Sequence, residues 1–526
     1  MRASLPRSLL LVALAGAAQA ASLAWPFAFG LAPGAPVGWL QLLSLGVLAW
    51  QVDRCRAGDD WRHAAGLGWL FALCWLGGTF WWLFISMHTY GGLSAVLAVL
   101  AVAVLAGLLA LYYAAACAVF VALVPASRAL SAIVFAALWL LAELARDQWF
   151  TGFPWGAGGY AQVDALGMFA SSVGVFGVGW IATLLAYLVA AWLRQPGTLV
   201  LRPWGLLAAL LPVAVLVALA RHPWSTDSGT LGVTLLQGNI PQDEKFQGGS
   251  GIPVALQWYG ERLQAARTPL VVAPETAIPL LPQQLPAGYW AALQQRFAQP
   301  GVNGPQAALI GIPLGSYEQG YTNSALGLAP GQAAPYRYDK HHLVPFGEFI
   351  PPLFRWFTEM MNIPLGDFNR GAVGQPSFKV DGQRLAPNIC YEDLFGEELG
   401  ARFRDAAAAP TILVNMSNIG WFGNTVAIDQ HLQISRMRAL EFERPMIRAT
   451  NTGPTVIIDY RGHVTRELPR YTRGLLVGEV QGRSGITPYA WWVSRLGLWP
   501  LWALGFLSVA LALWQRRRSG GAPEGP

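Results

Sequence analysis

Long apolar runs fill the beginning of the chain and return once near its end. A bilayer core requires about 20 consecutive apolar residues in a helix, and eight runs come close to or exceed that length. We therefore predict seven membrane spans before a long soluble segment and one span after it. The predicted spans are Leu9–Leu31, Val37–Val52, Leu67–Ser86, Leu93–Val124, Leu130–Leu144, Met168–Leu193, Pro203–Ala220 and Gly497–Trp514.

Between about His222 and Tyr489 the pattern changes to short β-rich runs, separated by Gly, Pro and Asn turns and by helical stretches. Alternating strands and helices predict a layered α/β domain. The predicted strands are Gly232–Gln237, Leu270–Ala273, Ala307–Ile312, Ser324–Leu328, Leu385–Ile389, Thr411–Asn415, Met446–Thr450 and Thr455–Asp459. The predicted helices are Val254–Ala266, Gly288–Ala298 and Ala427–Glu443.

Composition agrees with a membrane protein. Hydrophobic residues make up 54% of the chain and charged residues 12%, whereas soluble domains average about 25% charged residues. The apolar surplus is expected to face lipid. Many of the 24 Trp residues fall at the ends of the apolar runs, where an amphipathic ring suits the headgroup zone.

Arginines predict the orientation, because short cytoplasmic loops of membrane proteins collect Lys and Arg. With the amino terminus inside, the short outer loops hold little beyond Arg146, so the segment after Ala220 is expected outside the cytoplasm. The net charge of +6 is then mainly an orientation signal, and no nucleic-acid partner is expected. The inner loops and the tail hold Arg2, Arg7, Arg54, Arg56, Arg62, Arg128, Arg194, Arg202, Arg516, Arg517 and Arg518.

The first residues allow an alternative. Met1–Ala20 combines two arginines, an apolar stretch and an Ala-Gln-Ala ending that is typical of a signal-peptidase site. Cleavage would leave six spans that start outside, and retention leaves seven that start inside. Both alternatives put the soluble segment on the external side. We expect helical spans in residues 1–221, an external domain in 222–489, a last span in 490–515 and a cytoplasmic tail in 516–526.

Cys390 is the one cysteine of the predicted external domain, because Cys55 falls in an inner loop and Cys74 and Cys117 fall in predicted spans. An unpaired thiol in an oxidising compartment is either buried in a core or used chemically. Cys390 ends an apolar strand, at a position from which a side chain projects into a site. This position favours a nucleophile over the alternative of a core thiol.

Two further strand ends supply what a thiol nucleophile needs, which is a base for its proton and a donor for the oxyanion of acyl transfer. Glu275 follows the apolar strand Leu270–Ala273, and Lys340 stands in the polar segment Tyr338–Glu348. Only three of the 35 basic residues are lysines, so lysine is not a generic surface charge in this chain. Taken singly, each residue is typical of a solvated surface; together they indicate a site.

Glu275, Lys340 and Cys390, in this order, resemble the Glu-Lys-Cys triad of the nitrilase superfamily. In that superfamily each residue of the triad follows a strand. The resemblance covers about residues 230–480. It extends to the segments Asn415–Asn418, Arg436–Glu441 and Arg448–Gly453. The resemblance implies an α-β-β-α sandwich.

The soluble domain interrupts a set of membrane spans, and this architecture resembles the apolipoprotein N-acyltransferase family. The specific matches are Gln237–Gln242 and His342–Glu348, and the likeness spans essentially the whole chain. It implies an enzyme of the bacterial inner membrane, with its catalytic domain on the periplasmic side. The implied acyl donor is a phospholipid. The implied acceptor is the α-amino group of the diacylglyceryl-cysteine at the amino terminus of an apolipoprotein.

The family resemblance also implies roles for the triad. Cys390 would attack the phospholipid ester and carry the acyl group as a thioester. Glu275 would accept the proton. Lys340, with a backbone N–H near Tyr391, would stabilise the oxyanion.

Glu348, Tyr391 and Glu392 are expected to support these three. Glu348 can hold Lys340 or Glu275 by charge-assisted hydrogen bonding. The alternative for all three supporting residues is a purely structural role, because carboxylates beside a lysine often only orient it.

Large apolar side chains gather in Phe349–Phe357, Met360–Leu365 and Gly420–Gly423. Because both implied substrates carry acyl chains anchored in the outer leaflet, we expect lipid contacts in these stretches; docking on the protein's own helices is the alternative. The family more often has Trp at the position of Phe246, where an aromatic contact is expected. The expected lipid-contacting residues are Phe246, Phe349, Phe357, Trp421 and Phe422.

Two other functions compete. A membrane-tethered amidase of the nitrilase type would use the same triad but release an acid to water, and its tether needs only one span. A transporter usually carries charged or broken helices at mid-membrane, whereas the predicted spans are nearly free of charge apart from Glu143. No cofactor or metal is expected, because adjacent His341 and His342 point in different directions and no further ligand spacing completes a site.

Overall fold

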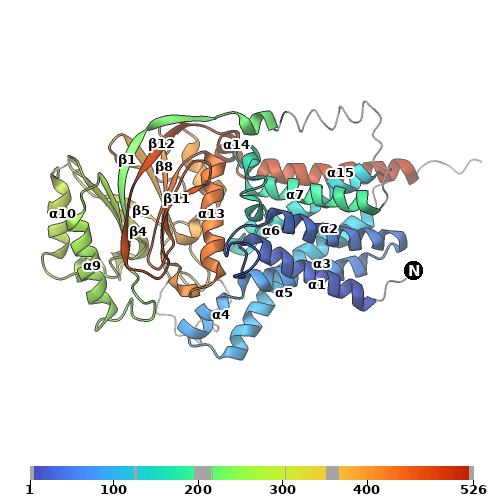
Figure 1. Cartoon of the computed structure of the whole chain (residues 1–526), viewed down its shortest axis with the longest axis horizontal. Helices are drawn as coiled ribbons and strands as arrows, with labels where there is room; N and C mark the ends of the chain where they lie inside the picture. Colours follow the sequence, from blue (N-terminus) through green and yellow to red (C-terminus); the bar gives the residue numbers. More distant parts are fainter. Residues whose placement is uncertain are drawn as a thin grey trace, which may run out of the picture. The chain divides into compact units, whose positions relative to one another are not determined.

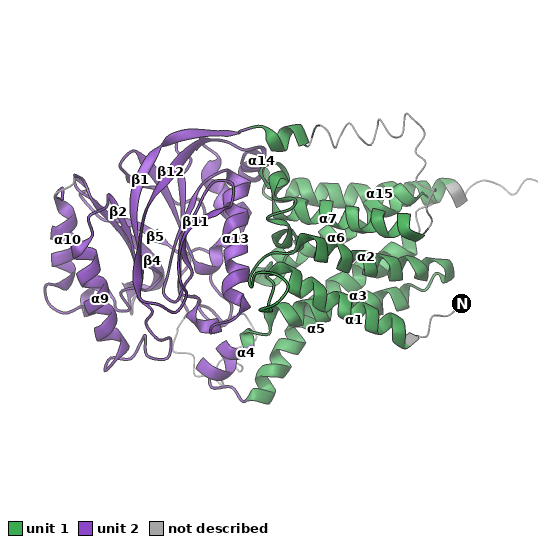
Figure 2. Cartoon of the chain, viewed as in Figure 1, with its two compact units in different colours: residues 1–83, 95–222, 496–526 green, residues 84–94, 223–495 purple. Residues whose placement is uncertain are grey.

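The computed structural model describes residues 5–123, 127–194, 215, 217–301, 304–350 and 367–520. The chain divides into two compact units, which Figure 2 shows in different colours. The helical unit contains residues 1–83, 95–222 and 496–526. The α/β unit contains residues 84–94 and 223–495 and holds both β-sheets. The predicted span Pro203–Ala220 falls mostly outside the described residues.

The helical unit consists of long apolar helices. Among the described residues, four helices are long and apolar enough to cross a membrane, or up to six if each of two bent helix pairs forms one span. This confirms a multi-span helical domain, while the number of eight spans stays a prediction. The helices are α1 Leu5–Leu23, α2 Gly38–Cys55, α3 Trp61–Phe80, α5 Ala95–Leu123, α6 Arg128–Gln148, α7 Ala170–Arg194 and α15 Trp499–Gly520. The short helix α4, Leu83–Ile85, belongs mostly to the α/β unit.

The first span differs from its prediction. The sequence predicts a span as far as Leu31, but α1 ends at Leu23, three residues before Pro26. Proline lacks an N–H and disfavours the helical conformation of the residue before it. The residues that follow form bends, where Trp25 Nε1 donates to the carbonyl of Phe29 at 2.8 Å.

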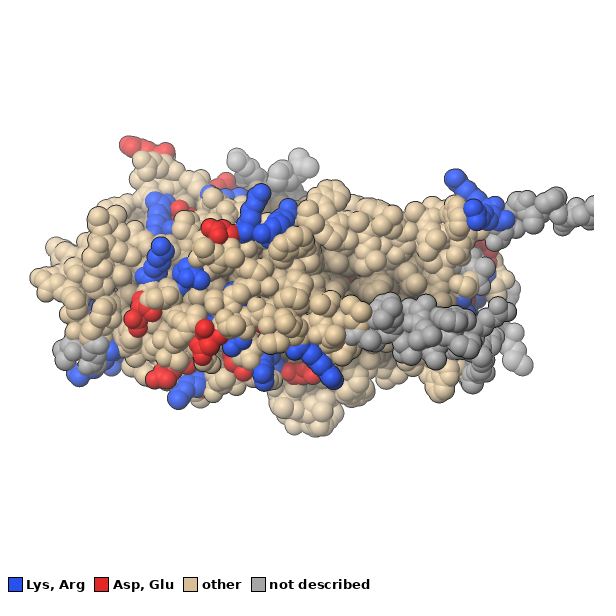
Figure 3. Space-filling model, turned by 90° about the horizontal axis from the view of Figure 1, so that it is seen from above, with Lys and Arg blue, Asp and Glu red and all other residues tan. Residues whose placement is uncertain are grey.

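Apolar side chains cover much of the outside of the helical unit. On α5, Val96, Val99, Val104 and Leu108 are each more than half exposed. Figure 3 shows many Lys, Arg, Asp and Glu side chains on the α/β unit. The face of the helical unit that is visible in this view has few of them. An apolar exterior of this extent requires lipid around it.

The segment between α6 and α7 contains short 3-10 helices and turns, and polar side chains of α6 form hydrogen bonds with its backbone. Glu143 Oε1 accepts from the Gly158 N–H at 2.8 Å, and Arg146 Nη1 donates to the carbonyls of Phe153 and Trp155 at 2.6 and 2.8 Å. Non-helical backbone at membrane depth persists only where such partners exist. The sequence places Arg146 in an outer loop; this is wrong, because Arg146 lies in the last turn of α6 and is 1% exposed.

Basic side chains gather at one end of the helical unit. Arg56, after α2, and Arg194, at the end of α7, both pair with Asp53. Arg516 of α15 donates to the carbonyl of Ala122, at the end of α5. The predicted inner arginines that the structure describes at these helix ends therefore lie on one side of the bundle.

The α/β unit contains two six-stranded sheets. The first has the strand order β12-β1-β2-β3-β4-β5, and the second has the order β11-β10-β9-β8-β7-β6. In each sheet three central strands run parallel, β1-β2-β3 and β7-β8-β9, and the outer pairs are antiparallel. The strands are β1 Ser225–Gln237, β2 Leu270–Val272, β3 Ala307–Ser316, β4 Gly320–Leu328, β5 Tyr336–Asp339, β6 Phe378–Val380, β7 Gln383–Ile389, β8 Ile412–Ser417, β9 Met446–Thr450, β10 Thr455–Ile458, β11 Val464–Leu468 and β12 Gly474–Gly485.

The two sheets enclose one apolar core, and helices cover their outer faces (Figure 1). Val272 of β2 faces the core between the sheets, which Val414 of β8 enters from the other side. Val271, which precedes Val272 in β2, points to the opposite face of the sheet, because successive strand residues alternate between faces. It packs there with α9 (Gly251–Ala265) and α10 (Tyr289–Ala298). Helix α13 (Val426–Phe442) contacts β9 of the second sheet. The predicted α-β-β-α sandwich is confirmed.

Candidate active site

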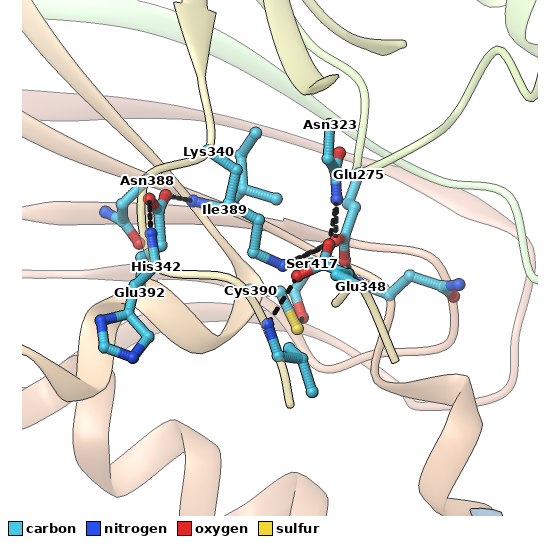
Figure 4. Close-up of polar contacts among 12 residues, drawn as sticks. Glu275, Asn323, Lys340, His342, Glu348, Asn388, Ile389, Cys390, Glu392 and Ser417 are labelled. Carbon is cyan, nitrogen blue, oxygen red and sulfur yellow. Dashed lines mark hydrogen bonds and ion pairs between the residues drawn. The ribbon is translucent and has the colours of Figure 1, made fainter. Parts of the chain in front are cut away.

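Three strand ends carry the candidate catalytic residues. Glu275 follows β2, Lys340 directly follows β5, and Cys390 directly follows β7. Strands β2 and β5 belong to the first sheet and β7 belongs to the second. In Figure 4 the three side chains point toward one another, together with Glu348, Asn323 and Ser417. The sequence therefore identified a group of residues that the fold brings together.

Lys340 is a buried cation held by two carboxylates. Its Nζ donates to Glu348 Oε1 at 2.8 Å and to Glu275 Oε1 at 3.3 Å, and the side chain is 1% exposed. Burial lowers the pKa of Lys340, but the charges of Glu348, Glu275 and Cys390 raise it, and the net pKa lies well above the ordinary value. The amine is therefore charged at neutral pH. These two contacts occupy two of its three N–H groups within the described part of the chain.

Glu275 is a buried carboxylate with donors on both oxygens. Asn323 Nδ2 donates to Oε1 at 2.8 Å, and the Asn418 N–H donates to Oε2 at 2.9 Å. Burial raises the pKa of Glu275, whereas the charges of Lys340 and Lys245 and these hydrogen bonds lower it, and the net pKa is below the ordinary value. Glu275 is therefore ionised at neutral pH and able to accept a proton.

Cys390 begins a short 3-10 turn, Cys390–Leu394, immediately after β7. Its φ is 52°, in the left-handed region that non-glycine residues rarely adopt. Ser417 Oγ, at the end of β8, donates to Sγ at 3.3 Å. Burial and the negative charge of Glu275 raise the pKa of Cys390 to about 12, although Lys340 opposes this rise. Cys390 therefore carries a neutral thiol at neutral pH.

A neutral thiol, an ionised carboxylate and a fixed cation within one buried cluster suit base-assisted acyl transfer. The carboxylate can take the thiol proton as the sulfur attacks. The cation can stabilise the oxyanion that develops on the attacked carbonyl. The same set suits every reaction that passes through a thioester, so the geometry alone does not select the substrate.

Comparisons with known proteins show to which enzyme family the chain belongs. Residues 17–188 match the model of the apolipoprotein N-acyltransferase N-terminal domain, and residues 233–489 match the model of carbon-nitrogen hydrolases. An apolipoprotein N-acyltransferase of Verminephrobacter eiseniae is 60% identical over 511 residues, which cover 92% of each chain. The chain belongs to the apolipoprotein N-acyltransferase family.

Further members of the family match over similar lengths. The apolipoprotein N-acyltransferase of Ralstonia nicotianae is 46% identical over 92% of this chain and 90% of its own length. That of Bordetella bronchiseptica is 40% identical over 96% and 97%. Together with the apolar helices, membership of this family makes the chain a membrane protein of the bacterial inner membrane, and it confirms the resemblance seen in the sequence.

The family segments Gln237–Gln242 and Asn415–Asn418 meet beside Glu275. Gln242 Oε1 accepts from Asn418 Nδ2 at 2.8 Å, and Asn418 Oδ1 accepts from Asn451 Nδ2 at 3.1 Å. Asn451 also accepts from the Ile240 N–H at 3.0 Å. This chain of amides fixes Asn418, whose N–H holds Glu275. The segment Arg448–Gly453, which also resembles the nitrilase superfamily, thus contributes Asn451 to the same network.

Glu392 joins the segment that carries Lys340 to the segment that carries Cys390. Its Oε1 accepts from the His341 N–H at 2.6 Å and the His342 N–H at 3.2 Å, and its Oε2 accepts from the Ile389 N–H at 2.6 Å and Tyr338 Oη at 2.7 Å. Four accepted hydrogen bonds hold this buried carboxylate between the two segments.

The other two supporting residues also lie in or beside the site. Glu348 makes the contact with Lys340 that the sequence suggests, and its Oε2 accepts from the Val344 N–H at 2.8 Å. Tyr391 follows Cys390, is buried, and packs its ring against His342 and Phe395. His342 Nδ1 lies 2.9 Å from Glu398 Oε1, whereas His341 Nδ1 lies 2.7 Å from the carbonyl of Gly371.

The expected lipid-contacting residues are half-buried where the structure describes them. The ring of Phe246 lies 5.8 Å from Lys245 Nζ, and the ring of Phe349 lies 4.8 Å from the guanidinium of Arg370. Trp421 meets the ring of Tyr90 edge-on at 5.8 Å. Phe422 follows Trp421 in the same 3-10 turn. Phe357, with most of Phe349–Phe357 and Met360–Leu365, lies outside the described residues.

Two site residues were missed in the sequence. Asn323, in β4, donates one amide to both Glu275 and Glu348, at 2.8 and 2.7 Å. Lys245 Nζ donates to the carbonyl of Glu275 at 3.1 Å, and the side chain is 1% exposed. The scarcity of lysine that drew attention to Lys340 applied equally to Lys245. Asn323 gave no comparable signal.

Proposed function

We propose that this chain is a phospholipid-dependent apolipoprotein N-acyltransferase. It moves a fatty acyl group from a phospholipid to Cys390, and from Cys390 to the α-amino group of the diacylglyceryl-cysteine at the amino terminus of a lipoprotein. The observation that carries the proposal is the cluster of Cys390, Glu275 and Lys340 in a chain that matches the family over both of its parts. Glu275 is the proton acceptor, Lys340 the oxyanion stabiliser and Cys390 the nucleophile.

In the first step the sulfur of Cys390 attacks the ester carbonyl while Glu275 takes the thiol proton. The charge of Lys340 and a backbone N–H near Tyr391 stabilise the tetrahedral oxyanion. The intermediate collapses by breaking the bond to the glycerol oxygen, which recovers the proton from Glu275. Lysophospholipid leaves, and a thioester remains on Cys390.

In the second step the neutral α-amine of the lipoprotein attacks the thioester, and Glu275 takes a proton from the nitrogen. The carbon–sulfur bond breaks, and the thiolate recovers that proton. The ionised Glu275 and neutral Cys390 of the resting site are restored, so the two steps balance without a cofactor or metal.

We also propose that the α/β unit lies on the periplasmic side. The support is the basic end of the helical unit, where Arg56, Arg194 and Arg516 lie at helix ends, since basic residues favour the cytoplasmic face. Reporter fusions test this. A fusion near Gly474 is expected to be active only outside, and one after Arg518 only inside. An inside signal at Gly474 contradicts the topology.

The proposed activity is tested with purified protein in detergent. Incubation with a phospholipid labelled in its acyl chain is expected to give a labelled adduct on Cys390, which hydroxylamine releases. Addition of a diacylated lipopeptide is expected to move the label to the peptide amine. The Cys390→Ser protein is expected to form no adduct, while a variant lacking Cys55, Cys74 and Cys117 remains active.

The same experiment distinguishes the proposed acyltransferase from the alternative, a membrane-tethered amidase. A tethered amidase would discharge its acyl-enzyme to water, so label would appear as free acid at the same rate with or without lipopeptide. Full transfer by Cys390→Ser protein would exclude the thioester step.

A further inference from the structure

A second buried polar cluster contacts the backbone of the nucleophile. Its members are His431 and Ser435 on α13, Arg448 on β9 and Asp393 in the turn after Cys390, and none of them is exposed. His431 Nε2 lies 3.2 Å from the carbonyl oxygen of Cys390 and 2.8 Å from Asp393 Oδ1. None of these four residues belongs to the triad or touches its reacting atoms.

The contacts fix the protonation of the imidazole. Both neighbours of Nε2 are oxygens that only accept, so Nε2 carries the hydrogen. Arg448 Nη2 lies 2.6 Å from Nδ1, and a guanidinium only donates, so Nδ1 carries none. His431 is therefore a neutral imidazole with its hydrogen on Nε2. Burial and the charge of Arg448 lower the pKa of His431 against the opposing effect of Asp393, which agrees with this state.

Asp393 is held in turn. Ser435 Oγ donates to its Oδ2 at 2.6 Å, while Oδ1 accepts from His431. Arg448 supplies the positive charge that balances this buried carboxylate. An ionic pair linked through an imidazole holds the ring with little freedom to rotate.

The carbonyl that His431 contacts belongs to a strained residue. Cys390 has a φ of 52°, and such conformations persist only where the surroundings enforce them. The same carbonyl accepts from Asn415 Nδ2 of β8 at 3.1 Å. The Cys390 carbonyl and the Tyr391 N–H share one planar peptide. Holding the carbonyl therefore sets both the direction of the thiol and the direction of that N–H.

We propose that His431 is a positioning residue for the nucleophile: its Nε2–H holds the Cys390 carbonyl, and Arg448 and Asp393 fix the imidazole form that makes this donation. The inference rests on the proposed role of Cys390. Loss of the donor is expected to misplace the thiol, and a misplacement of about 1 Å costs on the order of 10²-fold in rate. Substrate binding is expected to change little, because none of the four residues lies among those that the sequence predicts to contact lipid.

The test compares two variants of the full chain in detergent. His431→Leu removes the donor, and His431→Gln retains an amide donor and acceptor. The steady-state rate of lipopeptide acylation is measured against phospholipid concentration, and the Cys390 adduct is followed in parallel. His431→Leu is expected to lower kcat by roughly 10- to 100-fold with KM within about twofold of wild type. His431→Gln is expected to recover most of that loss. Thr234→Val is the matched control. This variant loses the hydrogen bond between Thr234 of β1, in the other sheet, and Thr268, which is part-buried like the bond from His431 to the Cys390 carbonyl.

The following outcomes would overturn the positioning role of His431. A folded His431→Leu protein with wild-type kcat, or equal loss in His431→Leu and His431→Gln, overturns the inference alone. If His431→Leu does not fold, Asn415→Ala removes the other donor to the same carbonyl and is expected to lower kcat in the same way; an unchanged kcat overturns the inference. Absence of any adduct in wild-type protein overturns the proposed function and this inference together.

Discussion

Gly311 of β3 lies directly against Glu275: a β-carbon at Gly311 would come within 2.8 Å of the Glu275 Cα and 2.7 Å of the Thr276 nitrogen. Backbone atoms cannot move aside as a flexible side chain can. The missing side chain therefore allows the segment after β2 to pass close to β3. Because the Ile278 N–H donates to the Gly311 carbonyl at 3.1 Å, the two segments are also joined by a hydrogen bond.

The first prediction is that Gly311→Ala displaces Glu275 and lowers the rate of Cys390 adduct formation by on the order of 10²-fold. The added methyl group cannot fit unless the Glu275 backbone shifts. The measurement is single-turnover labelling with phospholipid. Gly249→Ala is the control, since nothing lies within 4 Å of a β-carbon there. Equal rates in the two variants would contradict the argument.

The second prediction concerns Glu392→Gln, which replaces one accepting oxygen by an NH2 group that only donates. Two of the four groups that donate to Glu392 then lose their acceptor. Each buried group left without a hydrogen bond lowers the stability of the folded protein by about 1–3 kcal/mol. Adduct formation is expected to fall at least tenfold while its pH profile keeps its shape, because Glu392 acts through position. The exposed Glu479→Gln serves as control. A changed pH profile would instead assign Glu392 to the proton transfers.

The general form of the site was predictable from the sequence because its chemistry sits at strand ends. An apolar run followed by Glu275, Lys340 or Cys390 places a rare residue type at a predictable point of a sheet. The strands themselves were recognisable where both faces are buried, as in β2, whose three residues are all buried. The same pattern explains why β8 and β9 were found.

Other features depend on long-range contacts that leave no local signal. Four strands, β5, β6, β11 and β12, were missed. Strands β5 and β6 have only four and three residues, β11 is largely exposed, and Gly and polar residues obscure the alternation in β12. Asn323 contacts Glu275, 48 positions away, and His431 contacts the Cys390 carbonyl, 41 positions away. An amide within a strand or an imidazole on a helix has many ordinary uses, so sequence alone gave no reason to select either residue.

The third prediction uses the buried Lys245. Burial lowers the pKa of Lys245 from 10.5 to about 7, against the opposing charges of Glu275 and Cys390. Between about pH 7 and pH 10.5 the unfolded chain binds a proton at this residue that the folded chain does not, so wild-type stability gains with rising pH across this window. Lys245→Met lacks that gain.

The measurement is thermal unfolding of wild type and Lys245→Met at pH 6, 7.5 and 9. The melting temperature of Lys245→Met relative to wild type is expected to be highest at pH 6 and to decline at pH 9. Lys379→Met is the control, because Lys379 is exposed on β6. A constant difference between wild type and Lys245→Met would show that Lys245 keeps its proton in the folded protein.

The last prediction separates Glu275 from Lys340, whose charges act on Cys390 in opposite directions. Glu275 raises the pKa of the thiol and Lys340 lowers it. Glu275→Gln is therefore expected to increase the thiolate fraction at a given pH and speed alkylation by iodoacetamide, whereas Lys340→Met is expected to slow it. Acylation by phospholipid should fall in both, because the first variant lacks the base and the second lacks an oxyanion donor worth roughly 10²–10³ in rate.

Alkylation and acylation are measured in parallel from pH 7 to 9.5, with Glu261→Gln, an exposed carboxylate on α9, as control. Because the pKa of Cys390 is about 12, the alkylation rate of wild type should still be rising at pH 9.5. Slower alkylation in both variants would contradict the opposing effects of the two charges. Normal acylation in Glu275→Gln would remove Glu275 as the base, because a neutral thiol with so high a pKa requires a proton acceptor at the moment of attack.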